Sequence, residues 1–285
     1  MNILSLNGGG SLGYAVAVIL NKLEEELNKP CKEIFDLIAG VSTGSIIGYG
    51  LASGISAKQI MLCYEDFIPK IFRRKSGLIM SLFKPYYNIN DLRKAIYETY
   101  NGIEIYNPFT KFMTYATQVT GKYVQPKFWK SWKDNKENAL DMIVASCAAP
   151  LYFAPYKINN DWFVDGGLSS NSPNMSAIVE AIKMNINFNE IKLLNITPNG
   201  LSGFKKPNRE LVGLTRVARH AVGISLFGSE MDKNYQSRKL LGSNFYYINC
   251  ECGLPMDSKL LIDIKNFAEM YWYTHKYDIL YFLNN

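Results

Sequence analysis

The sequence contains very little histidine and no sign of paired cysteines. His220 and His275 are the only histidines among 285 residues, and the five cysteines include no C-x-x-C pair. A histidine-built metal centre, a zinc site and a disulfide framework are therefore not indicated. We expect a reduced, cytoplasmic protein that needs neither a metal nor a cofactor.

Dense runs of positive charge are also missing. The formal net charge is only +6, and no stretch has the Lys/Arg density of a nucleic-acid-binding arm, so we expect no nucleic-acid partner. The opening MNILSLNGGG has neither the positive region nor the apolar stretch of a signal peptide. The mild positive charge suits an anionic partner such as a phospholipid surface without requiring one.

Strand-like and helix-like patterns alternate along the chain. Short apolar runs bounded by glycine predict strands, and apolar positions with a period of 3.6 predict helices. The predicted strands are 2–6, 34–40, 111–119, 161–167, 191–197 and 245–249. The predicted helices are 13–29, 57–68, 90–100, 138–147, 174–184, 211–223 and 258–283. This alternation favours an α/β fold with a mainly parallel sheet and helices on both faces, built as one domain over residues 1–285.

One uncharged run, from Leu37 to Ala57, is long enough at 21 residues to cross a bilayer. Its glycines have the spacing of packed transmembrane helices. They lie at positions 40, 44, 48, 50 and 54. Several serines make the run only weakly apolar, and a buried helix packed closely against a sheet explains the same glycines. We therefore expect no membrane span.

The same run contains Gly40-Val41-Ser42-Thr43-Gly44, a G-x-S-x-G pattern between a predicted strand and a helical stretch. A sharp strand-to-helix turn exposes a serine Oγ at the sheet edge, beside a helix N-terminus that favours negative charge. Side chains at Gly40 and Gly44 would collide in so tight a turn. Ser42 is therefore a candidate nucleophile.

A glycine cluster, LNGGGSLG at 6–13, lies between the first strand and the first helix. Its free N–H groups suit a phosphate or a developing oxyanion. The spacing Gly8-x-Gly10-x-x-Gly13 also fits the fingerprint of an NAD or FAD enzyme. That fingerprint needs an acidic residue at the end of the next strand, whereas Asp36 lies near its beginning. A purely structural turn is a third interpretation.

The segment WFVDGG at 162–167 places Asp165 at the end of an apolar strand, followed by Gly166 and Gly167. Alone, it would be an Asp-Gly turn. Because a serine hydroxyl is a poor nucleophile until a base accepts its proton, Asp165 becomes a candidate base for Ser42.

Four segments in this order resemble the patatin-like phospholipase family. They are the glycine turn, the G-x-S-x-G pattern, ASCAAPLYFAP at 145–155 and the D-G-G, and the resemblance covers residues 2 to about 172. It implies a three-layer α/β/α fold and a lipid acyl hydrolase of phospholipase A or lysophospholipase type. Ser42 would form an acyl-enzyme, and Asp165 would be its general base. The implied oxyanion hole is the backbone around Gly8, Gly9, Gly10 and Ser11.

The chain departs from the family's usual pattern at two positions of the glycine turn. Leu12 stands where the family usually has Arg or Lys, which removes a side-chain cation and leaves the headgroup preference open. Asn7 replaces a common aspartate, a milder change. The sequence also leaves open the acyl position, the regulator and the oligomeric state.

Two other functions fit parts of the pattern. The order Ser42, Asp165, then His220 or His275 would suit a His-dependent α/β-hydrolase, although both histidines lie in helical patterns and the nucleophile comes early for that fold. A catalytically weak lipid-binding or regulatory protein could have kept the same motifs.

A basic and apolar segment, from Lys70 to Lys84, contains five basic residues and no acidic one. Such a composition is typical of segments that lie at an anionic membrane interface, but a solvated charge cluster explains it equally well. The candidate membrane contacts are Arg73, Arg74, Lys75 and Lys84.

Overall fold

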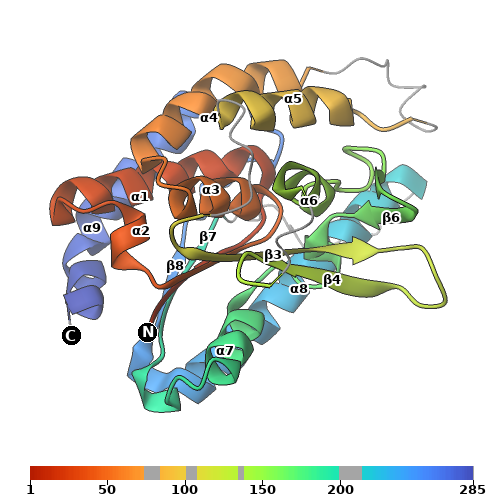
Figure 1. The fold of residues 1–285 in the computed structure, drawn as a ribbon. Helices are drawn as coiled ribbons and strands as arrows, with labels where there is room; N and C mark the ends of the chain where they lie inside the picture. The colour runs from red at the N-terminus through yellow and green to blue at the C-terminus, as the bar shows by residue number, and fades with distance from the viewer. Residues whose placement is uncertain (74–83, 101–107, 134–137, 199–213, 285) are drawn as a thin grey trace.

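The structure is a computed structural model that describes residues 1–73, 84–100, 108–133, 138–198 and 214–284, with side chains from Gly223 onward in the last range, Phe227 excepted (Figure 1). The strands are β1 (Asn2–Leu6), β2 (Leu37–Gly40), β3 (Lys111–Gln118), β4 (Gln125–Lys130), β5 (Tyr156–Ile158), β6 (Asp161–Val164), β7 (Lys192–Thr197) and β8 (Phe245–Asn249). The helices are α1 (Gly13–Leu27), α2 (Cys31–Ile34), α3 (Thr43–Ala52), α4 (Ala57–Ile71), α5 (Ile89–Thr99), α6 (Ala139–Ser146), α7 (Asn174–Lys183), α8 (Leu214–Leu241) and α9 (Leu261–Asn284).

The strands form one mixed sheet in the order β5-β6-β3-β2-β1-β7-β8, with β4 paired to β3 outside this path. The five strands from β3 to β8 in this order are parallel, and β4, β5 and β6 are antiparallel to their neighbours. The predicted α/β fold with a mostly parallel central sheet is confirmed. The sequence prediction missed β4 and β5, which lie on the antiparallel side of the sheet.

The register of β3 determines where the D-G-G segment lies. β3 pairs with β2 only through its first residues and then runs on past the end of β2. β6 returns antiparallel along this overhang, with Val164 opposite Thr117. The residue that follows β6, Asp165, therefore comes back to the sheet edge at which the parallel strands β1 and β2 end.

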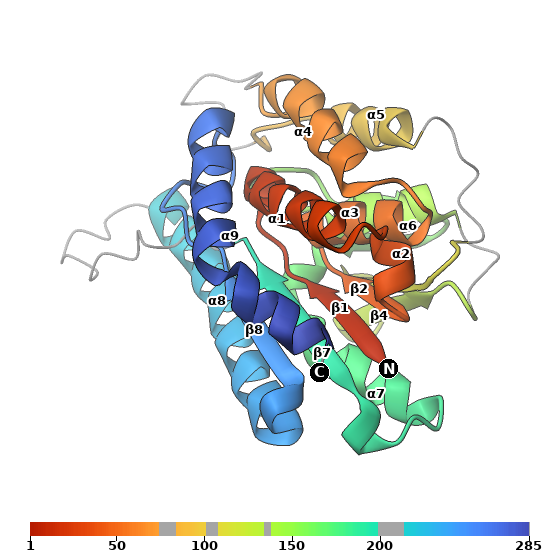
Figure 2. The ribbon, with the colours of Figure 1, turned by 90° about the vertical axis from the view of Figure 1, so that its left-hand side faces the viewer.

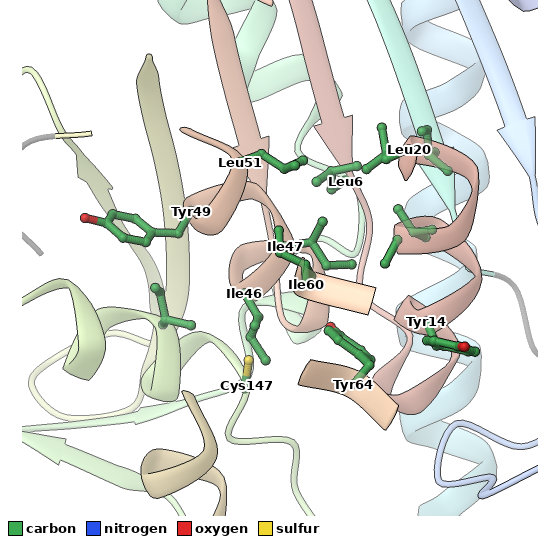
Figure 3. Close-up of a cluster of buried hydrophobic side chains, with 14 of the residues drawn as sticks. Leu6, Tyr14, Leu20, Ile46, Ile47, Tyr49, Leu51, Ile60, Tyr64 and Cys147 are labelled. Carbon is green, nitrogen blue, oxygen red and sulfur yellow. The ribbon is translucent and has the colours of Figure 1, made fainter. Parts of the chain in front are cut away.

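Helices cover both faces of the sheet (Figure 1). Alternate strand residues point to opposite faces, so Leu4 and Ile38 join the core under α1 and α3, while Ile3 and Leu37 join the core over α7. The first core is the larger one and includes Leu6, Leu20, Ile47 and Ile60 (Figure 3). On this side α9 packs along α1, and α4 and α5 form an outer pair (Figure 2).

The uncharged run of the sequence becomes the whole of β2 and the helix α3, and all ten residues of α3 are buried. Its glycines allow close packing; for example, Gly48 lies against Ile38 and Phe112. Within the described residues, no helix combines the length and the apolar character needed to cross a bilayer.

The largest error in the predicted elements concerns α8. The pattern predicts a helix over 211–223, but α8 continues to Leu241. Its inward-facing stripe mixes polar and apolar residues at helical spacing, so hydrophobic periodicity does not reveal it. The buried members of this stripe are Leu226, Glu230, Asn234, Ser237 and Leu241.

Candidate active site

Ser42 occupies the strained turn that the G-x-S-x-G pattern predicts. It follows β2, precedes the first residue of α3, and has φ 54° and ψ −129°, in the region that favours glycine. A Cβ at Gly44 would lie 2.2 Å from the Leu6 carbonyl oxygen, and one at Gly40 would lie 2.2 Å from the Gly44 carbonyl oxygen. Both positions therefore require glycine.

Two neighbouring serines hold the backbone of Ser42 in this conformation. The Ser42 N–H donates to Ser146 Oγ at 2.9 Å, and Ser45 Oγ donates to the Ser42 carbonyl at 2.6 Å. Ser146 ends α6 and is fully buried. These bonds satisfy the polar groups of a turn that the regular ladder of the sheet does not reach.

Asp165 lies directly against Ser42. Ser42 Oγ donates to Asp165 Oδ2 at 2.7 Å, and the Gly167 N–H donates to Asp165 Oδ1 at 2.7 Å. Asp165 is only 3% exposed, and burial raises its pKa to about 7, although the hydrogen bonds from Ser42 and Gly167 oppose the rise. The structure thus brings together the two residues that the sequence predicts as nucleophile and base.

The glycine turn passes beside Ser42. A Cβ at Gly8 would lie 3.0 Å from Ser42 Cβ, so the turn is in contact with the serine. The N–H groups of Gly8, Gly9 and Gly10 donate to no acceptor in the described part of the chain. They are available for an anion that forms next to Ser42 Oγ.

The Ser11 N–H, which the resemblance places in the oxyanion hole, is already used by another hydrogen bond in this structure. This N–H donates to the Met256 carbonyl at 2.7 Å, and Ser11 Oγ bonds the same oxygen at 3.0 Å. A Cβ at Gly10, where φ is +59°, would lie 2.2 Å from this carbonyl. The segment around Met256 therefore covers this end of the turn, and Ser11 has no free N–H in this conformation.

The other positions of the glycine turn have structural roles. Gly13 begins α1, and a Cβ there would lie 2.4 Å from Thr43 Oγ1. Leu12 is fully buried in the apolar core, so this position offers no cation to a substrate. Asn7 accepts a hydrogen bond from Asn195 and donates one to Thr197, beneath the turn.

A cavity of about 690 Å³, including its opening to solvent, lies over Ser42 and Asp165. Most of its wall comes from apolar side chains of α3, α4, α5 and the loops that cover them; Ile46, Tyr64 and Cys147 of this wall are drawn in Figure 3. The apolar and aromatic lining residues are Ile46, Tyr64, Phe67, Ile68, Ile71, Phe72, Leu92, Cys147, Ala149, Tyr152, Phe153, Leu226 and Met256. Such a wall accommodates a hydrocarbon chain next to the polar pair.

No histidine is among the described residues that line this cavity. His275 lies in α9, where its Nδ1 is 2.9 Å from the Tyr271 carbonyl and its ring stacks on that of Tyr271. His220 lies in α8, and its side chain is outside the described residues. The alternatives therefore differ in support: Asp165 contacts Ser42, and His275 belongs to another part of the molecule.

The basic segment is only partly described. Arg73, just after α4, and Lys84 are both exposed. Arg74 and Lys75 lie outside the described residues. The predicted membrane contact stays a prediction.

Sequence reasoning missed several residues around the site. Asn171 is buried and lines the cavity, and its Nδ2 donates to the Gly8 carbonyl at 3.2 Å. Its place six residues after Asp165 was the only available signal. Ser146 lies in the segment ASCAAPLYFAP that carries the resemblance, but its contact with Ser42 was not predicted. Met256 gave no signal, because it reaches the site through a contact between distant parts of the chain.

Known proteins are similar in sequence to this chain, and a family model covers the region that contains Ser42 and Asp165. The sequence model of the family described as Patatin-like phospholipase matches residues 4–178. A cGAMP-activated phospholipase of Escherichia coli (strain TW11681) is 32% identical over 69% of this chain and 61% of its own length. A cUMP-AMP-activated phospholipase of Escherichia coli is 27% identical over 82% of this chain and 74% of its own.

A plant protein gives a similar match. Patatin-like protein 4 of Arabidopsis thaliana is 30% identical over 61% of this chain and 50% of its own length. The chain thus spans between half and three quarters of the relatives named here. Since the family model covers more than half of the chain, including Ser42 and Asp165, the chain belongs to the patatin-like phospholipase family.

Proposed function

We propose that this protein is a lipid acyl hydrolase of the phospholipase A or lysophospholipase type, with Ser42 as nucleophile and Asp165 as general base. One observation carries the proposal: the 2.7 Å hydrogen bond from Ser42 Oγ to a buried Asp165 carboxylate, at the polar end of an apolar cavity. The phospholipase names of the two Escherichia coli relatives support the same class of substrate.

The reaction would proceed in two halves. Asp165 Oδ2 takes the proton of Ser42 Oγ as this oxygen attacks the acyl carbonyl carbon, and the carbonyl oxygen becomes an oxyanion. The free N–H groups of the glycine turn, at Gly8 to Gly10, would stabilise this charge. Asp165 then gives its proton to the departing alcohol oxygen, which leaves an acyl-enzyme at Ser42.

Water completes the cycle. Asp165 takes a proton from the attacking water, a second oxyanion forms in the same place, and its collapse releases the fatty acid and returns the proton to Ser42 Oγ. A base with a pKa of about 7 suits both proton transfers near neutral pH, because a useful base is matched to the working pH.

The wall of the cavity supports a long acyl chain as the part of the substrate that is bound most closely. Because Leu12 is buried, we propose that headgroup contacts come from outside the glycine turn. The exposed Arg73 and Lys84 are the described candidates for contact with an anionic lipid surface. Replacing both by Gln should weaken binding to anionic vesicles, by about 1 kcal/mol of binding free energy per residue, as measured by co-sedimentation. Hydrolysis of a short soluble ester should stay unchanged.

The decisive experiment combines labelling with turnover. A fluorophosphonate should label the protein, mass spectrometry should locate the adduct on Ser42, and Ser42→Ala should lose both the label and the hydrolysis of a chromogenic ester. Because two relatives are named for activation by cyclic nucleotides, turnover should be measured with and without cGAMP and cUMP-AMP. Lipid binding without any Ser42-dependent turnover would favour the alternative, a lipid-binding regulatory protein.

A further inference from the structure

A second carboxyl group is buried near the glycine turn and does not line the cavity. Glu230 of α8 has no exposed surface. Its Oε1 accepts a hydrogen bond from Tyr247 Oη at 3.0 Å, and its Oε2 accepts one from Asn171 Nδ2 at 3.4 Å. Burial raises the pKa of Glu230, and hydrogen bonds from Thr197, Tyr247, Asn7 and Asn171 oppose the rise.

Two routes lead from Glu230 to the glycine turn. In the first, Asn171 Nδ2 contacts both Glu230 and the carbonyl of Gly8, so that one amide group joins the carboxylate to the turn. In the second, Thr197 at the end of β7 accepts a hydrogen bond from Asn7, the residue before Gly8. The side chains of Thr197 and Asn7 also lower the pKa of Glu230, so both lie near its carboxyl group.

Asn171 also contacts the turn sterically. Its Oδ1 would lie 2.5 Å from a Cβ at Gly8 and 2.9 Å from a Cβ at Gly167. It therefore packs between the glycine turn and the D-G-G turn that carries Asp165. A shift of this side chain would move the free N–H groups of the glycine turn relative to Ser42.

A buried carboxyl group is costly to the fold unless other groups compensate it. Around Glu230, the described partners are neutral hydrogen-bond donors, and all of them belong to the elements that carry the glycine turn, the D-G-G turn and the neighbouring strands β7 and β8. A leucine at this position would fill the space of α8 without that cost. The arrangement thus points to a need for a hydrogen-bond acceptor here.

We propose that Glu230 is a positioning residue, which fixes the N–H groups of Gly8 to Gly10 toward the acyl oxyanion by acting on Asn171, Thr197 and Asn7; this inference rests on the proposed hydrolase function. Glu230 does not touch the cavity or the substrate. It acts through the turn, so its contribution grows as negative charge develops on the substrate oxygen. Its loss should therefore lower kcat more than it changes KM.

The test compares Glu230→Ala with Glu180→Ala. Glu180 serves as the control because it is a largely buried glutamate in another helix, α7, where it pairs with Lys130. Turnover of a short soluble ester is divided by the number of sites that a fluorophosphonate titrates, so that a partly unfolded sample does not count as slow enzyme. We expect Glu230→Ala to lose about 10- to 100-fold in kcat per titrated site, with little change in KM, and Glu180→Ala to lose less than twofold.

Two further variants make the test specific. Glu230→Gln should recover most of the loss, because its amide oxygen can accept from Asn171 while its NH₂ group donates to Tyr247 Oη. Tyr247→Phe removes one hydrogen bond and keeps Glu230, so it should give a smaller loss of kcat in the same direction, of about two- to fivefold. Tyr247→Phe also replaces Glu230→Ala as the test variant if Glu230→Ala does not fold.

The outcomes are distinct. A wild-type protein without Ser42-dependent turnover would overturn the proposed function itself. An active wild type in which Glu230→Ala, or Tyr247→Phe if the alanine variant does not fold, keeps the wild-type kcat per site would overturn the positioning role alone. Equal losses for Glu230→Gln and Glu230→Ala would also overturn it, since an acceptor oxygen would then be insufficient.

Discussion

Asp165 and Glu180 are both largely buried carboxyl groups, at 3% and 9% exposure, yet their regions of the molecule affect them in opposite ways. Burial tends to raise the pKa of both. Near Glu180, the hydrogen bonds and charges of Lys130 and Lys183, at 2.8 and 3.3 Å, bring its pKa below the ordinary value. Near Asp165, the described partners are the hydroxyl of Ser42 and the N–H of Gly167, and its pKa rises to about 7.

The difference shows what the absence of a cation achieves. Glu180 is held as a carboxylate and joins α7 to β4 through Lys130, which is a structural role. Asp165 has only neutral donors among the described residues, so it can gain and lose a proton near neutral pH. A buried carboxyl group is therefore suited to proton transfer only where no cation neutralises it.

The largest expected effect is on activity, where substitutions of Asp165 and Glu180 should differ most. Asp165→Asn should lower kcat/KM at least about 10²- to 10⁴-fold, the usual range for losing a general base, while Glu180→Gln should stay within about twofold. Ser42→Ala and the double variant should each lose about as much kcat/KM as Asp165→Asn, without additivity, because nucleophile and base act as a unit. His275→Ala is the control for the alternative base, and a folded His275→Ala as inactive as Ser42→Ala would contradict the dyad.

The free energy of unfolding should change in the opposite direction from activity: Asp165→Asn should gain stability above about pH 7, and Glu180→Gln should lose it. Asp165 has a folded-state pKa above its unfolded value, so its contribution to stability is present at low pH and is lost as pH rises to about 7. Above that pH, Asp165→Asn should be more stable than the wild type, by on the order of a few kcal/mol. Glu180→Gln should be less stable, because Lys130 loses its partner. Urea unfolding at pH 8 and pH 5 checks both signs; an Asp165→Asn variant that is less stable at pH 8 would contradict the role of burial.

The pH profile sharpens the same contrast. In the proposed mechanism Asp165 must be ionised to accept the proton of Ser42, so kcat/KM should rise about tenfold per pH unit up to about pH 7 and then level off. Between pH 5 and pH 7 the gain in kcat/KM is about 50-fold, because half of the Asp165 carboxyl groups are ionised at a pH equal to the pKa. Glu180→Gln should leave the profile unchanged. An inflection near pH 4 in a short-ester assay would show that burial does not control the base.

The smallest expected effect concerns the support of Ser42. Ser146→Ala removes the acceptor of the Ser42 N–H, which should lower kcat about tenfold, in line with the loss of one hydrogen bond at a strained turn. Ser237→Ala is a matched control, since Ser237 is also a fully buried helical serine but bonds Lys233 of its own helix and Met175 of α7, not Ser42. Equal activity of the two variants would show that the turn keeps its conformation without Ser146.

The turns that carry Ser42 and Asp165 could be predicted from the sequence because each turn depends on a local pattern. A strand that ends in G-x-S-x-G or D-G-G predicts its own turn. Leu12 also illustrates a local signal, since the missing cation is visible in the sequence, and its burial explains why an apolar side chain fits there. The extension of α8 was not predictable in this way, because Glu230 and Asn234 interrupt its apolar stripe.

By itself, the sequence determined the alternation of strands and helices, the two glycine-flanked turns and the types of side chain at Ser42 and Asp165. Short-range sterics and the hydrophobic period are enough for these features. Tertiary structure alone decided that Ser42 meets Asp165 across 123 residues, that the Met256 carbonyl accepts from the Ser11 hydroxyl across 245 residues, and that Glu230 lies near the glycine turn. Such contacts follow from how β6, α8 and the segment before α9 pack against the sheet edge, and no local pattern encodes the partner of a distant hydrogen bond.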